Sequence, residues 1–215
     1  MNQSRGPLHI AIEGPIGAGK TTLAKRLAAS FDSQLLLEQA EDNPFLKRFY
    51  RHRRDNALAT QLFFLFQRAQ LLEQRQQGDL FNAGTVADFM IEKDPLFAGI
   101  NLDSHELALY QKVYDQLAPE ASSPDLTIYL QAPTSTLLSR IRQRGILSEQ
   151  AIEKRYLEQI NEAYAEFFLY YDASPLLIVN ADEIDFANSD DQYQELVDYL
   201  LEIRSGRHYF NPTFF

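Results

Sequence analysis

The stretch from Glu13 to Thr22, EGPIGAGKTT, constrains the fold of this chain more than any other. It matches the pattern G-x-x-x-x-G-K-[ST], a phosphate-binding loop that joins a strand to a helix. The residues before it, 8–12, form a short apolar run typical of a buried strand, and Leu23, Leu27 and Phe31 follow at helical spacing. The sequence therefore predicts an α/β fold that begins with a phosphate-binding loop.

Within this loop each kind of residue has its own task. Glycines let backbone amides turn toward a phosphate chain, and the start of the following helix adds the positive end of its dipole. Lys20 is expected to reach the β- and γ-phosphates, and the Thr21 hydroxyl to bind Mg²⁺. The residues expected to contact the nucleotide in this loop are Gly14, Pro15, Ile16, Gly17, Ala18, Gly19, Lys20, Thr21 and Thr22.

Composition and charge exclude several classes of protein. The 215 residues, 45% of them hydrophobic, suffice for one domain, 1–215, with a substantial core. With 20 Lys and Arg against 30 Asp and Glu, the net charge of −10 argues against nucleic-acid and anionic-membrane partners. The chain has no membrane-length apolar run, no signal-peptide pattern at its start and no cysteine. We therefore expect a cytoplasmic protein without disulfides.

Short apolar runs alternate with amphipathic ones along the chain. Strands are predicted at 8–12, 34–38, 85–88, 125–130 and 176–179, and helices at 20–31, 44–50, 56–76, 94–97, 104–117, 134–144, 150–171 and 192–204. This alternation predicts a five-stranded parallel sheet with helices on both faces, of the P-loop NTPase type. Ligands bind beyond the carboxyl ends of such strands, where the loop, Glu38 and Asp88 fall. Tyr209, Phe210, Phe214 and Phe215 are expected in a tail that docks on an apolar surface.

A phosphate loop alone does not distinguish switches, motors, ATPases and kinases. The Asn-Lys-x-Asp sequence of guanine-nucleotide switches is absent, and little of the chain remains for mechanical subdomains. A kinase needs cations over the transferring phosphoryl group and a base for the acceptor hydroxyl. Arg140, Arg142 and Arg144, with Gly145 as a candidate hinge, are candidates for an arginine lid. The alternative is a basic helix end that faces the helix dipole.

Several further positions narrow the family. They are Glu38 at the end of the second strand, Asn43-Pro44-Phe45 with Tyr50, Gln61 seven residues before Arg68, Asp88, Asp94, the lid, Glu149 and the stretch 180–186. With the phosphate loop, they resemble the deoxyribonucleoside kinases, particularly the bacterial deoxyadenosine/deoxyguanosine kinase branch, over nearly the whole chain. The resemblance implies an enzyme that uses ATP and Mg²⁺ to phosphorylate the 5′-hydroxyl of a deoxyribonucleoside, with purines favoured.

The resemblance also implies roles for single residues. Glu38 resembles the base that takes the proton of the 5′-hydroxyl, and Asp88 the acid that holds Mg²⁺ through water together with Thr21. Lys20, Arg140 and Arg144 would stabilise the transferring phosphoryl group. The alternative for Glu38 is an exposed acid at a strand end.

On the acceptor side, Gln61 resembles the amide that pairs with the nucleobase, since it offers one donor and one acceptor. Arg68 and Asp94 resemble a pair that tunes which base fits, or they form only a salt bridge. Tyr50 and Glu149 resemble the pair that grips the 3′-hydroxyl, with a core tyrosine and a helix-capping glutamate as the alternatives. Asp185 and Phe186 belong to the stretch that resembles the adenine-side loop of the donor.

Two positions depart from the family pattern. The family commonly has an arginine directly after the acid of the third strand, where this chain has Phe89, and often one after the lid glycine, where it has Ile146. Loss of two cations would slow phosphoryl transfer unless Arg142 substitutes. Phe89 would instead pack against the sugar or base.

Two alternatives to a deoxynucleoside kinase stay open. In a kinase of nucleotides or other small metabolites, Lys47, Arg48, Arg51, Arg53 and Arg54 would bind a phosphate-bearing acceptor. A non-catalytic structural protein of the same fold would be consistent with Phe89. The resemblance also suggests a homodimer formed through 56–76 and 104–117, although a helix as apolar as 56–76 could equally lie in the centre of a monomer.

Overall fold

A computed structural model describes residues 9–78, 84–117 and 123–212 of the chain. Its sheet has six strands, all parallel, in the order β2-β3-β1-β4-β5-β6. They are β1 His9–Glu13, β2 Gln34–Leu36, β3 Thr85–Ala87, β4 Leu126–Gln131, β5 Leu176–Asn180 and β6 Arg207–Phe210. The predicted α/β fold is confirmed, but the predicted number of five strands is wrong.

The sixth strand comes from the segment predicted as an aromatic tail. β6 pairs with β5 in parallel, with Tyr209 opposite Ile178 and Phe210 opposite Val179. Phe210 is buried and packs edge-on against Tyr199 at a ring-centroid distance of 5.4 Å. An edge strand this short is stabilised mainly by its neighbour, so its sequence pattern is weak. Phe214 and Phe215 lie outside the described residues.

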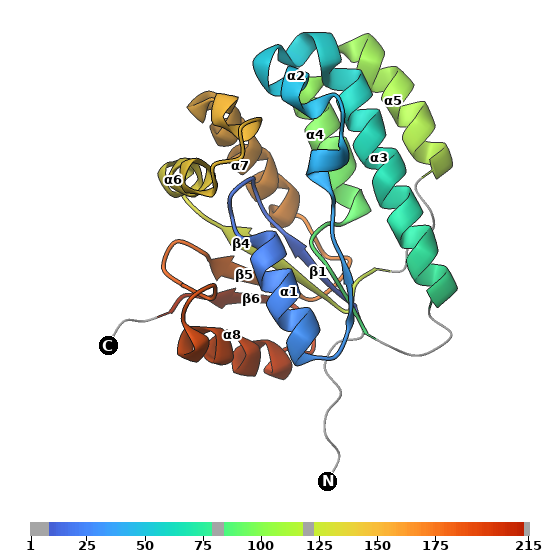
Figure 1. The fold of residues 1–215 in the computed structure, drawn as a ribbon. Helices are drawn as coiled ribbons and strands as arrows, with labels where there is room; N and C mark the ends of the chain where they lie inside the picture. Colours follow the sequence, from blue (N-terminus) through green and yellow to red (C-terminus); the bar gives the residue numbers. More distant parts are fainter. Residues whose placement is uncertain (1–8, 79–83, 118–122, 213–215) are drawn as a thin grey trace.

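Helices cover both faces of the sheet (Figure 1). They are α1 Lys20–Ser30, α2 Leu46–Arg51, α3 Arg53–Gly78, α4 Asp94–Asn101, α5 Ser104–Leu117, α6 Thr134–Arg144, α7 Lys154–Leu169 and α8 Asp190–Glu202, with short 3-10 turns at Ala40–Asp42, Ile91–Lys93 and Glu149–Ala151. On one face, α1 and α8 lie side by side, joined by the Arg26–Asp190 ion pair and the Ser30–Tyr193 hydrogen bond. On the other face, α7 and α4 pack under the sheet and α3 and α5 extend beyond it.

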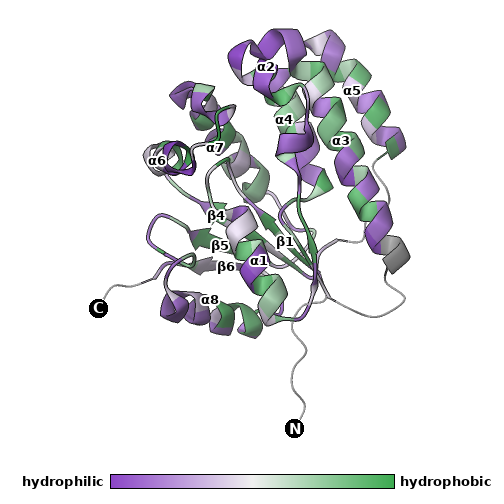
Figure 2. Cartoon of the chain, viewed as in Figure 1, coloured by the Kyte–Doolittle hydropathy of each residue, from purple (hydrophilic) through white to green (hydrophobic). Residues whose placement is uncertain are grey.

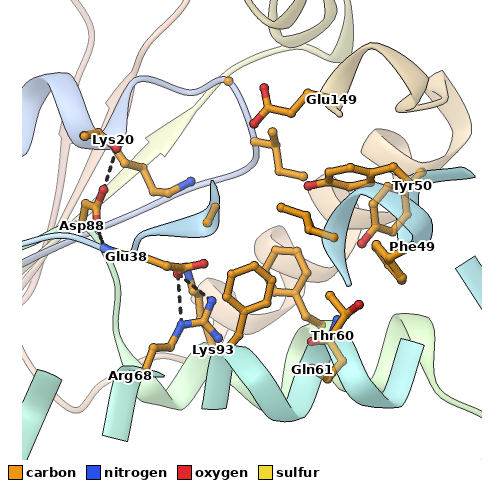
Figure 3. A pocket seen from close by; sticks show the side chains of 18 of the residues that line it. Lys20, Glu38, Phe49, Tyr50, Thr60, Gln61, Arg68, Asp88, Lys93 and Glu149 are labelled. Atoms are coloured by element: carbon orange, nitrogen blue, oxygen red, sulfur yellow. Dashed lines mark hydrogen bonds and ion pairs between the residues drawn. The ribbon is translucent and has the colours of Figure 1, made fainter. Parts of the chain in front are cut away.

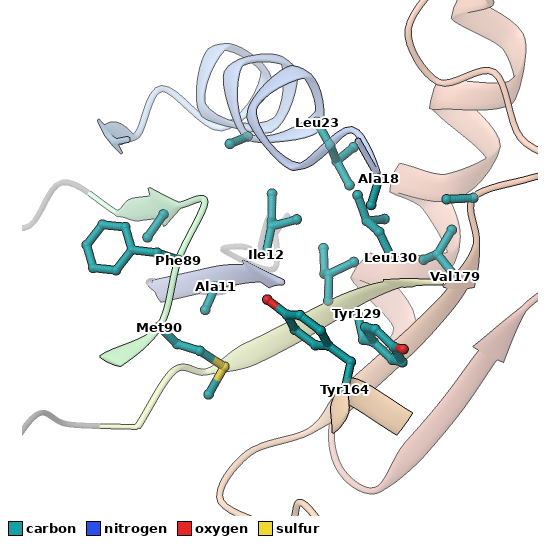
Figure 4. Packing of buried hydrophobic residues seen from close by; sticks show 14 of the residues in the cluster. Ala11, Ile12, Ala18, Leu23, Phe89, Met90, Tyr129, Leu130, Tyr164 and Val179 are labelled. Carbon is teal, nitrogen blue, oxygen red and sulfur yellow. The ribbon is translucent and has the colours of Figure 1, made fainter. Parts of the chain in front are cut away.

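The core lies between these helices and the central strands. All five residues of β1 are buried, as expected for a strand covered on both faces. Leu23 of α1 packs above β1, whereas Tyr129 of β4 and Tyr164 of α7 lie below it (Figure 4). The Tyr129 ring stacks on Phe168 at 4.4 Å between centroids. Figure 2 shows the hydrophobic strands at the centre and a mostly hydrophilic α2 at the periphery.

Several element ends differ from the predictions in ways that matter for the site. β2 ends at Leu36, so Glu38 lies two residues beyond the strand, and Asp88 comes directly after β3. The helix predicted at 150–171 begins only at Lys154, because a 3-10 turn that contains Glu149 precedes it. Glu38 and Asp88 therefore lie just beyond the strands, at the carboxyl edge of the sheet.

Candidate active site

A cavity opens at the carboxyl edge of the strands, between the phosphate loop and the helices α2, α3 and α7. Its lining comprises Ile16, Gly17, Lys20, Thr21, Glu38, Ala40, Leu46, Phe49, Tyr50, Thr60, Gln61, Phe64, Arg68, Asp88, Lys93, Phe97, Arg144, Glu149 and Tyr156. It encloses about 810 Å³ of space outside atoms, its open mouth included. We call it the main cavity.

The phosphate loop has the backbone that its glycines predict. Gly14 and Gly19 have φ values of +150° and +103°, which disfavour residues with a side chain. A Cβ at Gly14 would lie 2.6 Å from the Leu130 carbonyl oxygen, and one at Gly19 would lie 2.9 Å from Cζ of Phe186. Since α1 begins at Lys20, its free N–H groups point at the loop and make it suited to an anion.

Lys20 and Asp88 lie at one end of the main cavity (Figure 3), where Thr21 is hydrogen-bonded to Asp88. The Lys20 ammonium donates to the carbonyl oxygens of Gly14 at 2.7 Å and Pro15 at 3.2 Å. Burial, helped by the charge of Lys93, lowers the pKa of Lys20 to about 8. The Thr21 hydroxyl donates to Oδ2 of Asp88 at 2.6 Å. This pair brings together the hard oxygen donors that Mg²⁺ prefers.

Glu38 lies beside these groups and faces the same cavity. The Asp88 carboxylate fixes its backbone, since Glu38 N donates to Oδ1 of Asp88 at 2.8 Å. The Arg68 guanidinium donates twice to Oε2 of Glu38, at 2.6 and 3.1 Å. Burial by itself would raise the pKa of Glu38, but the charges of Arg68 and Lys93 outweigh it and lower that pKa to about 2. The Glu38 carboxylate is therefore ionised at neutral pH.

Arg68 and Asp94 form an ion pair behind Glu38. The Arg68 side chain is 4% exposed and that of Asp94 is fully buried, and the pair joins Nη1 to Oδ1. Asp94 does not line the main cavity, whereas Arg68 does. Asp94 thus contacts the cavity only through the arginine, which it holds in place.

Lys93 is a further charged group in the cavity wall, and no feature of the sequence indicates it. Its side chain is 4% exposed, and its ammonium lies 3.1 Å from Oε1 of Glu13 and 3.5 Å from Oε2 of Glu38. Glu13 is fully buried. We call Glu13, Glu38, Arg68, Lys93 and Asp94 the buried charge cluster. A lysine in a short turn next to an acid is typical of exposed surface, so only the fold reveals this burial.

The other end of the main cavity carries polar groups of a different kind. Gln61, 3% exposed, comes from α3, and Tyr50 and Glu149 face the cavity from α2 and the turn before α7 (Figure 3). Burial raises the pKa of Tyr50 well above its ordinary value, with contributions from Tyr156 and the Glu149 carboxylate. The Thr60 hydroxyl is buried and has no hydrogen-bond partner among the described residues. Sequence analysis did not single out Thr60.

Phe89 does not line the main cavity, contrary to the prediction that it packs against a ligand. Its side chain is 1% exposed and lies in the hydrophobic core (Figure 4). Successive side chains of extended backbone point to opposite sides, so the turn of Asp88 toward the phosphate loop sends Phe89 the other way.

A second cavity lies on the far side of the phosphate loop. Its lining comprises Gly17, Ala18, Gly19, Thr22, Arg140, Gln143, Arg144, Ile184, Asp185, Phe186, Ala187 and Asn188. Arg140 donates to the carbonyl oxygens of Ala181 at 2.6 Å and Ala18 at 3.4 Å. Arg144 lines both cavities and pairs with Glu149. Arg142 is exposed and lines neither cavity, so it does not take the place of a missing arginine in this structure.

The basic cluster at 47–54 lies apart from both cavities. Lys47, Arg48, Arg51 and Arg54 are exposed, and Arg53 stacks over the Tyr156 ring at 4.5 Å and lies 3.6 Å from Glu153. None of these residues lines either cavity. This arrangement is that of a solvated helix face, not of a phosphate-binding patch.

Comparison with known proteins decides the family. A family model for deoxynucleoside kinases matches residues 10–203, which include every residue that lines the main cavity. The chain belongs to the deoxynucleoside kinase family. It is thus a phosphotransferase that acts on deoxynucleosides, and the resemblance of its motifs to this family is confirmed.

Individual relatives of the kinase agree with this assignment. A deoxyguanosine kinase from Bacillus subtilis (strain 168) is 37% identical over 199 residues, covering 90% of this chain and 96% of that protein. A deoxyadenosine kinase from Dictyostelium discoideum is 34% identical over 165 residues, or 74% of this chain and 66% of that one. The structure of deoxyadenosine kinase from M. mycoides with bound dCTP matches with a TM-score of 0.77 at 27% identity, over 91% of this chain and 100% of that chain.

Of the helices within the described ranges 9–78, 84–117 and 123–212, none is both long and apolar enough to cross a bilayer.

Proposed function

We propose that this kinase transfers the γ-phosphoryl group of ATP to the 5′-hydroxyl of a purine deoxyribonucleoside. The observation that carries the proposal is the meeting of Lys20, Glu38 and Gln61 in one cavity, from three separate elements. Relatives named deoxyguanosine and deoxyadenosine kinase support the purine preference.

The triphosphate would bind along the phosphate loop, with Lys20 beside its β- and γ-phosphates. There the Lys20 ammonium would exchange the Gly14 and Pro15 carbonyls for anionic oxygens, which bind a cation more strongly than neutral ones. Thr21 and Asp88 fit a Mg²⁺ ion held partly through water, because their oxygens already lie together. When bound, Mg²⁺ would offset the charge of the phosphates.

Glu38 would act as the base. Its carboxylate is ionised at neutral pH, and its contacts with Arg68 and Lys93 use Oε2. Among the described residues no hydrogen bond or ion pair ends on Oε1, which leaves that oxygen to accept the proton of the 5′-hydroxyl. The 5′ oxygen then bonds to the γ-phosphorus while the bond to the β–γ bridging oxygen breaks and ADP leaves.

At the other end of the cavity, Gln61 would pair with the purine edge through its amide donor and acceptor. Arg68, backed by Asp94, would border the base beside it. Tyr50 and Glu149, which both line this end of the cavity, would bind the 3′-hydroxyl. Together these contacts would orient the 5′-hydroxyl toward Glu38.

The second cavity would receive the donor side of ATP. Arg140 and Arg144 are placed beside the loop to contact phosphate oxygens, and Asp185 and Phe186 border the space where the adenine would lie. Arginine suits this task because its fork matches phosphate oxygens and stays charged.

Steady-state kinetics with purified protein tests this proposal. Wild type should phosphorylate deoxyguanosine and deoxyadenosine faster than pyrimidine deoxynucleosides. Glu38→Gln should lower kcat by about 1000-fold, the middle of the range for general base catalysis, while the nucleoside KM changes little. Glu41→Gln, which alters an exposed acid three residues away, serves as the control. Full activity of Glu38→Gln, or the absence of turnover with every deoxynucleoside, would contradict the proposal.

Two properties of the assembled enzyme belong to the same proposal: it forms a homodimer and works in the cytoplasm. Phe66 on α3 and Leu109 on α5 are 54% and 50% exposed on two helices that pack together, which supports a subunit contact there. Sedimentation of wild type and of Phe66→Glu tests the dimer. A monomeric wild type at micromolar concentration would argue against it.

A further inference from the structure

Lys93 is buried in the wall of the main cavity, whereas most lysines are exposed on the surface. Its side chain is 4% exposed, it lines the main cavity, and it lies between two carboxylates, those of Glu13 and Glu38. Burying an ammonium costs several kcal/mol unless its partners are well placed. The position therefore calls for an explanation beyond a chance ion pair.

Glu13 holds this ammonium at a fixed point. Its carboxylate also accepts hydrogen bonds from Met90 N at 2.7 Å, Tyr164 Oη at 2.8 Å and Gly14 N at 3.2 Å. Because these donors come from three separate parts of the fold, the carboxylate has little freedom to move. Lys93 is thereby tied to the first glycine of the phosphate loop.

From this anchor, Lys93 extends toward the proposed base. Its ammonium is 3.5 Å from Oε2 of Glu38, the oxygen that Arg68 already contacts twice. Since Arg68 alone could pair with this carboxylate, neutralising Glu38 does not require a second cation there. An ammonium has three N–H donors, and two carboxylates leave one of them for a group in the cavity.

The residue after Asp88 explains why the cavity needs a further cationic donor. Directly after Asp88, the family resemblance predicts an arginine, but this chain has Phe89, whose side chain lies in the core. The cations that line the main cavity are Lys20, Arg68, Lys93 and Arg144. Lys20 donates to loop carbonyls, Arg144 pairs with Glu149, and Arg68 uses three donors on two carboxylates. Lys93, which keeps one N–H beside Glu38, is therefore the cation placed to reach the acceptor oxygen.

We infer that Lys93 is a catalytic cation of phosphoryl transfer, which donates to the 5′ oxygen of the acceptor and offsets the charge that develops on the transferring group. The inference rests on the proposed function. Glu38 takes the hydroxyl proton, the bond between the 5′ oxygen and the γ-phosphorus forms, and the bond to ADP breaks. Lys93 keeps its own proton throughout. Removing one preorganised donor of this kind typically slows a reaction about 100- to 1000-fold.

The experiment compares Lys93→Met, Lys93→Arg and wild type with saturating ATP and Mg²⁺ and varied deoxyadenosine. Lys93→Met should lose about 100-fold or more in kcat with the deoxyadenosine KM within about fivefold, and Lys93→Arg should recover most of the loss. Lys154→Met is the matched control, because Lys154 also pairs with a glutamate but is exposed on α7. It should stay within about twofold of wild type.

Because Lys93→Met leaves Glu13 unpaired, a second variant guards against misfolding. Glu13→Gln with Lys93→Met removes both charges of the pair and should fold, yet it should retain the low kcat. Binding adds a readout that is independent of turnover. The probe is an analogue in which five phosphates join adenosine to the 5′ oxygen of deoxyadenosine. Lys93→Met should bind this analogue about 30-fold or more weakly than wild type does, whereas both proteins should bind deoxyadenosine alone about equally well.

The outcomes separate the two proposals. If wild type turns over deoxynucleosides and the double variant keeps kcat within about threefold, the role of Lys93 is wrong and the proposed function stands. The same holds if deoxyadenosine affinity falls as far as kcat/KM, since Lys93 would then serve binding. No turnover by wild type would overturn both.

Discussion

The buried charge cluster and the second cavity hold their cations in opposite ways. Arg68 and Lys93 pair with carboxylates, and all these side chains are 15% exposed or less. Arg140, in contrast, contacts only backbone carbonyls among the described residues, and the Arg144 side chain is 45% exposed. A cation held by neutral carbonyls can exchange them for phosphate oxygens at little cost, whereas one buried between carboxylates cannot.

This contrast suggests a division of labour within the kinase. The acceptor side would be preorganised, with the position of the Glu38 carboxylate determined before any substrate arrives. The donor side would rearrange when ATP binds, because Arg140 contacts replaceable backbone carbonyls and the Arg144 side chain, although paired with Glu149, is 45% exposed.

Breaking the buried charge cluster should affect folding itself. Arg68→Met leaves Asp94, which is fully buried, and Glu38 without their main partner. The free energy of unfolding should fall by about 3–5 kcal/mol, as for other buried pairs that lose one member. Urea denaturation measures this, and Arg68→Met with Asp94→Asn should recover part of the loss. If the free energy of unfolding fell by less than about 1 kcal/mol, the cations of the buried charge cluster would matter no more for folding than those of the second cavity.

The corresponding change in the second cavity should leave folding almost unaffected and weaken ATP use. For Arg140→Met we expect kcat/KM for ATP to fall about 30- to 100-fold, or about 2–3 kcal/mol, with unfolding changed by less than about 1 kcal/mol. Arg142→Met on the same helix is the control, because Arg142 is exposed and lines neither cavity. Equal effects of the two variants would argue against a donor-side role for Arg140.

The two sides should also differ in their response to pH. Lys20 has a pKa of about 8 in the free protein, and bound phosphates would raise it, since an anion stabilises the charged form. ATP binding then takes up a proton above pH 8, so ATP affinity should fall up to about fivefold between pH 8 and 9. Deoxyadenosine affinity should stay constant there, because Glu38, with a pKa of about 2, remains ionised. Titration calorimetry at pH 7, 8 and 9 measures both, and a constant ATP affinity would contradict the role of Lys20.

The smallest effect concerns the end of the lid helix. Gly145 ends α6 with a φ of +71°, and a Cβ there would meet no atom within 4 Å. Gly145→Ala should therefore cost only backbone strain, about 1 kcal/mol, or a Tm lower by about 2–4 °C. Gly99→Ala, also in open space but inside α4, should instead raise the Tm slightly. Equal shifts for the two would mean that strain at Gly145 is not the cause.

The sequence predicts most of what is local in this protein. The phosphate loop, the strand and helix on either side of it and the helices at 104–117 and 134–144 follow from patterns within a few residues of each other, and the structure has them. Glu38 and Asp88 are predicted to share a site because each ends a predicted strand of a parallel sheet, and the family resemblance adds Arg68 to that site. Family membership confirms the resemblance, while the roles of the single residues remain predictions.

Tertiary structure alone decided the rest, because it depends on groups far apart in the chain. β6 exists through its pairing with β5, and Phe89 lies in the core because Asp88 turns toward the phosphate loop. Lys93 is buried because β1 carries Glu13, and the segment after β2 carries Glu38, to within ion-pair distance of it. From its neighbours in the sequence alone, a lysine is predicted to be exposed on the surface. Only the folded chain supplies the two carboxylates that make its burial stable.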